Sequence, residues 1–282
     1  MRSLTVAPGR ETSWTGRAPR CCTVRVRHPS PSMFRGLARS SPWRWRALSF
    51  ELTRRPLHGP EHLVLGRLER GVGLDVRRPV AVQQSARRAS YAWRGATGSG
   101  TSELPFAWEL PVEVDADGFV VRRPPDQVSD DPMWQDYQFV AMLDPVELAD
   151  GCPRDPDPGW TPDAAPPPAL DVARVDSTVR LGRETWWAEV APLDTYEPRC
   201  SCCPLLFGRV SEGLLAAGAG PAPVDVRPHG FAHTTAYLVA LDVQTGVCVH
   251  VEHLDGDHTG RGFSLDLHGV DEDVDPVVVR PT

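Results

Sequence analysis

Three cysteines lie within four residues and form the densest group of reactive side chains in the chain. Cys200, Cys202 and Cys203 stand in the segment Tyr196-Glu-Pro-Arg-Cys-Ser-Cys-Cys-Pro204. Thiolates bind zinc and other soft metals, and they exchange with disulfides. The segment therefore predicts either a metal site or a redox site.

A metal site at these cysteines needs donors from elsewhere in the chain. His229 and His233 follow later in the same long connection, and Cys248 lies on a predicted strand. Structural zinc prefers four ligands that come in regular pairs such as Cys-x2-Cys, and the adjacent Cys202 and Cys203 depart from that spacing. Three interpretations stay open: a zinc site, a thiol switch, and a loop without chemistry.

The predicted strand at residues 247–254 adds a face with donor groups. Side chains alternate between the two faces of a strand, so Cys248, His250 and Glu252 are expected on one face and three valines on the other. The first face either joins the cysteine site or is a solvated face opposite an apolar core.

Aromatic side chains offer a second kind of site. Trp134 and Tyr137 fall on one face of a predicted helix, and Trp186 and Trp187 lie on a predicted strand. Aromatic residues bury large areas and line many apolar pockets. We expect these four side chains either to line a cavity for a hydrophobic ligand or to pack as ordinary core. No pair of acidic residues is spaced as a general acid and base, so the sequence predicts no catalytic residue.

Charge is distributed unevenly along the chain. All 30 basic residues are arginine, and lysine, asparagine and isoleucine are absent, which is typical of a GC-rich bacterial genome. Residues 1–50 contain ten arginines and a single acid, Glu11, so the remainder carries a net charge of about -16. An acidic domain repels phosphate backbones, which argues against a nucleic-acid partner.

No apolar run reaches the roughly 18 residues that a membrane span requires. The N-terminus also lacks the continuous apolar core of a signal peptide. We therefore expect a cytoplasmic protein without a transmembrane segment.

The hydrophobic pattern divides the chain into an extension, one domain and a tail. Residues 1–32 show no usable periodicity. We expect the extension at residues 1–40 either to be disordered or to be lengthened by a wrongly placed start, the true start being Met33. We expect one β-sheet domain at 41–275, interrupted by a proline-rich connector at 151–169. Residues 276–282 are expected to be a tail.

Alternating apolar residues predict antiparallel strands on both sides of this connector. The predicted strands are 48–53, 63–68, 72–76, 89–94, 170–179, 185–190, 234–241, 247–254 and 263–270. A hairpin is also predicted from Trp108–Val114 and Phe119–Arg122, around a turn that ends at Gly118.

A helical insertion is expected at residues 129–149. Asp131 and Pro132 occupy the positions of an N-cap and of the first helical residue. Asp144 and Glu147 have the spacing of a capping box for a second, short helix.

Two segments in the C-terminal half resemble lipoprotein-carrier-like proteins, the LolA, LolB and RseB group. They are LGRETWWAEVAP at Leu181–Pro192 and AYLVALDVQTGVCVHVEHLDG at Ala236–Gly256. The resemblance covers residues 170–270, and residues 43–150 only by strand count and an inserted helix. It implies a strongly curved antiparallel sheet wrapped over helices, whose concave face holds lipid-like ligands.

Together, the sequence predicts a mainly β (α+β) fold: a curved, half-barrel-like antiparallel sheet of roughly ten strands, with two or three helices on its concave side. The expected function is non-enzymatic binding of a hydrophobic small molecule or a protein segment in that concavity. A thiol or metal sensor built on the cysteine segment is the alternative, with zinc as the candidate cofactor.

Overall fold

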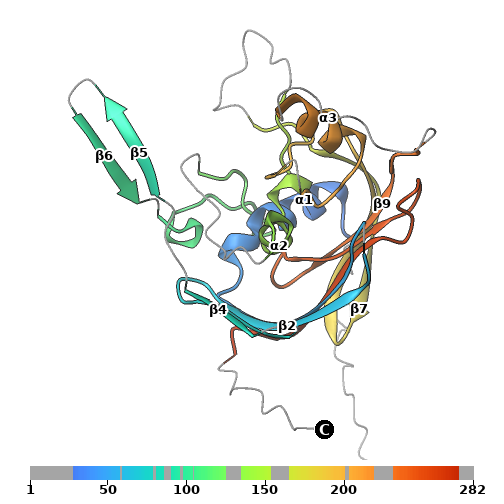
Figure 1. Ribbon diagram of the computed structural model, residues 1–282, viewed down its shortest axis with the longest axis horizontal. Coiled ribbons are helices and arrows are strands. Elements are labelled where there is room, and N and C mark those ends of the chain that lie inside the picture. Colours follow the sequence, from blue (N-terminus) through green and yellow to red (C-terminus); the bar gives the residue numbers. More distant parts are fainter. Residues whose placement is uncertain are drawn as a thin grey trace, which may run out of the picture.

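Nine strands form one open antiparallel sheet that curves around two helices (Figure 1). The computed structural model describes residues 28–57, 59–78, 81–85, 90–95, 98–103, 105–124, 135–153, 165–200, 203–218 and 231–272. The strands are β1 (Ala47–Arg55), β2 (His62–Glu69), β3 (Gly73–Arg78), β4 (Val82–Ser85), β7 (Leu170–Arg180), β8 (Arg183–Pro192), β9 (Tyr237–Asp242), β10 (Cys248–His253) and β11 (Gly262–Val270). The predicted fold class is confirmed.

The two halves of the chain meet in the middle of this sheet. Its strand order is β4-β3-β2-β1-β11-β10-β9-β8-β7, so the first and last strands are neighbours. Leu52 on β1 lies opposite Leu265 on β11, and both side chains are at most 1% exposed. One continuous apolar face therefore runs across both halves.

A separate hairpin leaves this sheet. β5 (Ser90–Gly95) pairs with β6 (Gly98–Glu103) and projects from the body of the molecule (Figure 1). The hairpin predicted at 108–122 keeps its turn, where the Asp115 side chain accepts bonds from the N–H groups of Asp117 and Phe119. Its strands are reduced to a single bridge between Val114 and Val120 and a 3-10 turn, η2 (Ala107–Glu109).

Helix α1 (Pro31–Ser40) begins ten residues before the expected start of the domain. The Ser30 hydroxyl accepts a hydrogen bond from the N–H of Met33, and Pro31 opens the helix. Phe34 and Leu37 are completely buried. The expectation of a disordered extension up to residue 40 is therefore wrong for this helix, and residues 1–27 lie outside the described ranges.

Helix α2 (Tyr137–Leu143) is shorter than the predicted insertion. Its N-cap is Asp136, and Gln135 has a φ of 66°, a left-handed conformation that a helix cannot include. Asp131 and Trp134 lie outside the described ranges. Tyr137 is 42% exposed, so its side chain is not part of the core. The face that it was expected to share with Trp134 falls outside the described ranges.

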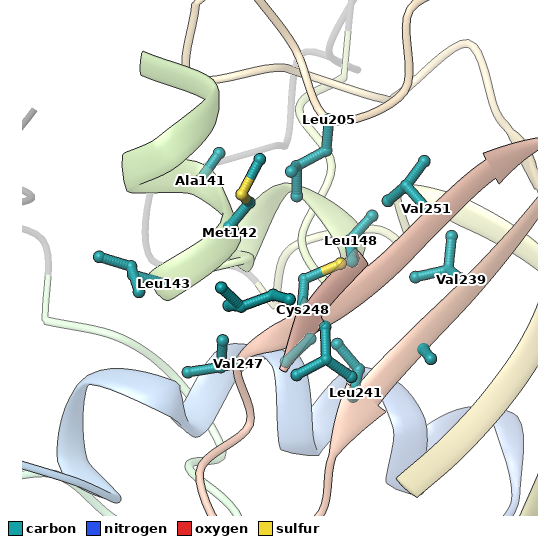
Figure 2. Packing of buried hydrophobic residues seen from close by; sticks show 14 of the residues in the cluster. Ala141, Met142, Leu143, Leu148, Leu205, Val239, Leu241, Val247, Cys248 and Val251 are labelled. Carbon is teal, nitrogen blue, oxygen red and sulfur yellow. The ribbon is translucent and has the colours of Figure 1, made fainter. Parts of the chain in front are cut away.

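The concave side of the sheet is filled by these helices. α1, α2 and the 3-10 turn η3 (Val146–Leu148) lie inside the curve in Figure 1. Figure 2 shows Met142 and Leu148 packed over Leu241 and Val251 of the sheet. Burying each such side chain contributes about 1.5 to 3 kcal/mol. Within the described residues, none of the helices is long and apolar enough to cross a membrane.

Candidate functional site

The four aromatic residues predicted to line a cavity do not come together in the described residues. Trp186 points into the concave side, is 6% exposed and meets the ring of Phe119 edge-on at 6.0 Å. Trp187, the next residue on β8, faces the outer side, where its ring lies 5.0 Å from that of His250. Tyr137 is largely exposed. These three residues therefore do not line one cavity.

Cys248 is part of the core rather than a metal ligand. Figure 2 shows it among Leu148, Leu241 and Val251, and it is completely buried. A bulge in the pairing of β10 with β9, between Cys248 and His250, shifts the alternation of side chains. Cys248 and His250 therefore lie on different faces of the sheet. The prediction that they share a face is wrong. Burial raises the pKa of its thiol, which keeps the thiol protonated.

The remaining predicted metal ligands are not gathered either. His233 pairs with Glu212, its Nδ1 lying 2.7 Å from the carboxylate Oε2. Cys202 and His229 fall outside the described ranges. Across the part of the chain that the structure describes, no group of three or more histidine, cysteine or acidic residues is placed to hold a metal ion. The predicted zinc site has no support there.

The segment that carries the cysteines is held by a buried glutamate. Glu147 on η3 is 1% exposed. Its Oε1 accepts hydrogen bonds from the Tyr196 hydroxyl at 2.5 Å and the Leu205 N–H at 2.7 Å, and its Oε2 accepts one from the Arg199 N–H at 3.0 Å. Burial raises the pKa of Glu147, and these hydrogen bonds oppose the shift. We call this arrangement the Glu147 clamp.

A second buried carboxylate supports the clamp. Asp144 lies between two arginines. The Nη2 of Arg123 is 2.7 Å from its carboxylate, and Arg199 also pairs with it. Burial alone would raise the pKa of Asp144, but the two guanidinium groups outweigh burial and lower it. The sequence had assigned Asp144 and Glu147 to a capping box. That assignment is wrong, because η3 begins at Val146, and its N-cap is Pro145, which makes no side-chain cap hydrogen bond.

A groove opens where the cysteine segment runs into helix α3 (Arg209–Gly218). It has a volume of about 840 Å³ and lies between α3, the end of β8 and the approach to β9. Its lining combines aliphatic, hydroxyl and charged groups: Ala191, Pro192, Asp194, Arg209, Val210, Gly213, Thr234 and Thr235. We call it the α3 groove.

One side of the α3 groove is fixed by a polar network that runs from the buried His253 to the exposed Thr235. The Thr234 hydroxyl lies 2.8 Å from Nδ1 of His253, and it donates to the backbone oxygen of Asp255 at 3.1 Å. The Asp255 carboxylate accepts bonds from the N–H and hydroxyl of Thr235. Burial lowers the pKa of His253 to about 4, so its imidazole is neutral at pH 7.

Aromatic rings surround this network. The ring of His253 lies 4.9 Å from that of Tyr237 and 5.9 Å from that of His258. Phe231 contacts both His233 and His258, with 5.2 Å between ring centroids in each case. Of these residues, the sequence had singled out His233 alone as a site candidate.

Comparisons of the chain with protein-family models, with curated proteins and with solved structures find no significant match. The resemblance to the lipoprotein-carrier-like proteins therefore stays a prediction. Function must be inferred from the packed concave face, the α3 groove and the Glu147 clamp.

Proposed function

We propose that the chain is a non-enzymatic binding protein whose apolar ligand or partner segment docks in the α3 groove. The observation that carries this proposal is the contrast between the concave face, which helices fill, and the groove at its rim. A groove of about 840 Å³ falls in the range typical of small-molecule sites. The sequence predicted a ligand inside the concavity of the sheet. The proposed site lies instead at the edge of the sheet, in the α3 groove.

The lining of the groove supports an amphipathic ligand. Pro192 and Val210 offer apolar surface, whereas Asp194 and Arg209 place opposite charges on exposed positions. A side chain or acyl group can bury against the first pair while polar groups of the ligand meet the second. Binding sites commonly combine an apolar body with a few polar groups that fix orientation.

Gly213 provides a direct test. It lines the groove, and a Cβ added there meets no atom within 4 Å, so a larger side chain projects into open space. We expect Gly213→Phe to reduce binding of the hydrophobic fluorophore anilinonaphthalene sulfonate at least tenfold. Val179→Phe, at a 73% exposed position on β7, is the matched control and should bind like the parent chain.

Native mass spectrometry of the purified protein completes this test. The proposal expects a co-purifying apolar molecule, or saturable uptake of the fluorophore, that Gly213→Phe removes. Unchanged binding in Gly213→Phe, or a parent protein that takes up no hydrophobic probe, would contradict the groove as the binding site.

A further inference from the structure

Cys200 and Cys203 are joined by a backbone hydrogen bond. The Cys203 N–H donates to the Cys200 carbonyl at 3.2 Å. Two residues three positions apart that are joined in this way have Cα atoms within about 7 Å of each other, and disulfides join cysteines whose Cα atoms are about 4.4 to 6.8 Å apart. This bond therefore brings the Cys-x-x-Cys pair close to the separation that a disulfide needs.

The Glu147 clamp fixes both flanks of this pair. Its carboxylate binds the N–H of Arg199, just before Cys200, and the N–H of Leu205, two residues after Cys203. Leu205 is 1% exposed, so the far flank is also held by the core. Chain entropy that would oppose closing a disulfide has therefore largely been lost already in the folded state.

The two thiols differ from Cys248 in access. Cys200 and Cys203 are both half-buried, whereas Cys248 is completely enclosed and burial raises the pKa of its thiol. A small reagent can reach the first two without unfolding the sheet. Redox-sensor cysteines are accessible to solvent and often lie next to a second cysteine that can resolve the first.

We propose that Cys200 and Cys203 form a reversible disulfide by exchange with a low-molecular-weight disulfide such as oxidised glutathione. The thiolate of one cysteine attacks the small disulfide, forming a mixed disulfide and releasing one small thiol. The second cysteine, as its thiolate, then attacks the protein sulfur of the mixed disulfide and releases the second small thiol. Two protein thiols are oxidised, one small disulfide is reduced, and both protein thiol protons are transferred to the departing thiolates. This site is independent of the proposed binding function.

The full-length protein can be tested by mapping its thiols after equilibration in glutathione buffers. Trypsin cleavage after Arg199 and Arg209 releases a peptide, residues 200–209, that contains Cys200, Cys202 and Cys203 and no other cysteine. As the buffer becomes more oxidising, we expect two of these three thiols to be protected from alkylation, with a peptide mass two hydrogens lower. Cys202→Ser should keep this disulfide and Cys203→Ser should lose it.

Two outcomes would overturn the assignment. One is a peptide that stays fully alkylated in buffers that already form mixed disulfides at the exposed Cys152. The other is a disulfide that persists in Cys203→Ser, because it would then involve Cys202.

The role of Glu147 as a positioning residue has its own readout. We expect Glu147→Gln to lower the equilibrium constant for the disulfide against glutathione about tenfold, equivalent to roughly 30 mV for a two-electron couple. Tyr196→Phe, which leaves both backbone bonds of the clamp in place, should lower it less. Val64→Ala on β2 destabilises the core far from the loop and should leave it unchanged. If Glu147→Gln and Val64→Ala have the same equilibrium constant for the disulfide against glutathione, Glu147 has no positioning role.

Discussion

The concave face and the rim of the sheet use the same strands in different ways. On the concave face, Val239 and Val251 are at most 1% exposed and pack with the core that α1 and α2 complete. We call the region where the cysteine segment and the α3 groove border this core the rim. The buried groups that face it are polar: Glu147 holds the cysteine segment, and His253 supports one side of the α3 groove. Apolar packing thus closes the interior, while directional bonds position a segment that solvent can reach.

This difference changes what a mutation should do. Removing apolar atoms from the interior costs free energy in proportion to the volume lost. Removing one polar group at the rim leaves its partners buried without hydrogen bonds, and each such group costs about 1 to 3 kcal/mol. The two regions are therefore separable by experiment.

The largest effect is expected from Phe139→Ala on α2. Phe139 is completely buried and its ring lies 5.7 Å from that of Phe50. We expect the free energy of unfolding in urea to fall by about 3 to 5 kcal/mol. Tyr137→Ala on the same helix, where the side chain is 42% exposed, should cost much less. Similar small costs for both variants would mean that the concave face is not packed core.

Glu147→Gln tests the rim and should cost about 2 kcal/mol, because an amide cannot accept as many hydrogen bonds as a carboxylate. The measurement is again urea unfolding at pH 7, with Glu69→Gln, at a more exposed position on β2, as the control. A loss no larger than that of the control would show that the clamp bonds contribute little.

The pH dependence of stability should separate the buried histidines from the buried carboxylates. The pKa of His253 falls to about 4 in the folded state from an ordinary value near 6.5, so the unfolded state binds the proton more tightly. Stability from this group is fully present above pH 6.5 and is lost as the pH falls towards 4, by about 2 kcal/mol at pH 5. His250, whose pKa is also lowered to about 4, adds a similar loss.

Glu147 acts in the opposite direction, because its raised pKa favours the folded state as the pH falls. The pKa of Asp144 is lowered, so the stability that Asp144 contributes is lost only as the pH falls below the usual pKa of a carboxyl group. We expect unfolding free energies measured from pH 7 to pH 5 to decline, and His253→Gln to reduce that decline relative to the exposed-site variant His268→Gln. An identical decline in both variants would contradict a buried neutral His253.

The sequence predicted the strands well because half-buried strands carry their own signal. Leu48, Phe50 and Leu52 alternate with polar residues, and the structure buries these three. Helix α1 was missed although Ser30 and Pro31 are a helix start, because the segment before it is rich in proline and arginine. Local patterns therefore identified sheets better than the helices that fill them.

The rim could not be predicted because its contacts join residues far apart in the chain. Glu147 binds residues 49 to 58 positions away, yet its sequence neighbourhood has the spacing of a capping box. The bulge beside Cys248 carries no sequence signal and changes which face the thiol occupies. The Cys-x-x-Cys spacing of Cys200 and Cys203 is visible in the sequence, but the bonds from Glu147 that hold both flanks of the pair are not.

Two glycines five residues apart should give effects of opposite sign, and the smallest effect of all is expected at the second of them, Gly213. A Cβ at Gly208 would overlap the Tyr237 hydroxyl and approach the Thr234 carbonyl oxygen to 2.8 Å, so Gly208→Ala should cost about 1 to 3 kcal/mol. A Cβ at Gly213 meets nothing within 4 Å, so Gly213→Ala should raise the stability of α3 by about 0.5 to 1 kcal/mol.

Thermal unfolding of both variants measures this difference. If Gly213→Ala destabilises the protein as Gly208→Ala does, then the space beside Gly213 is filled in solution, and the α3 groove is not open. If Gly208→Ala is neutral, the junction between the cysteine segment and α3 is looser than its contacts with Tyr237 imply. A loss of stability in Gly208→Ala together with a gain in Gly213→Ala requires tight packing where the cysteine segment enters α3 and open space one turn later. The α3 groove can bind a ligand only if that space is open.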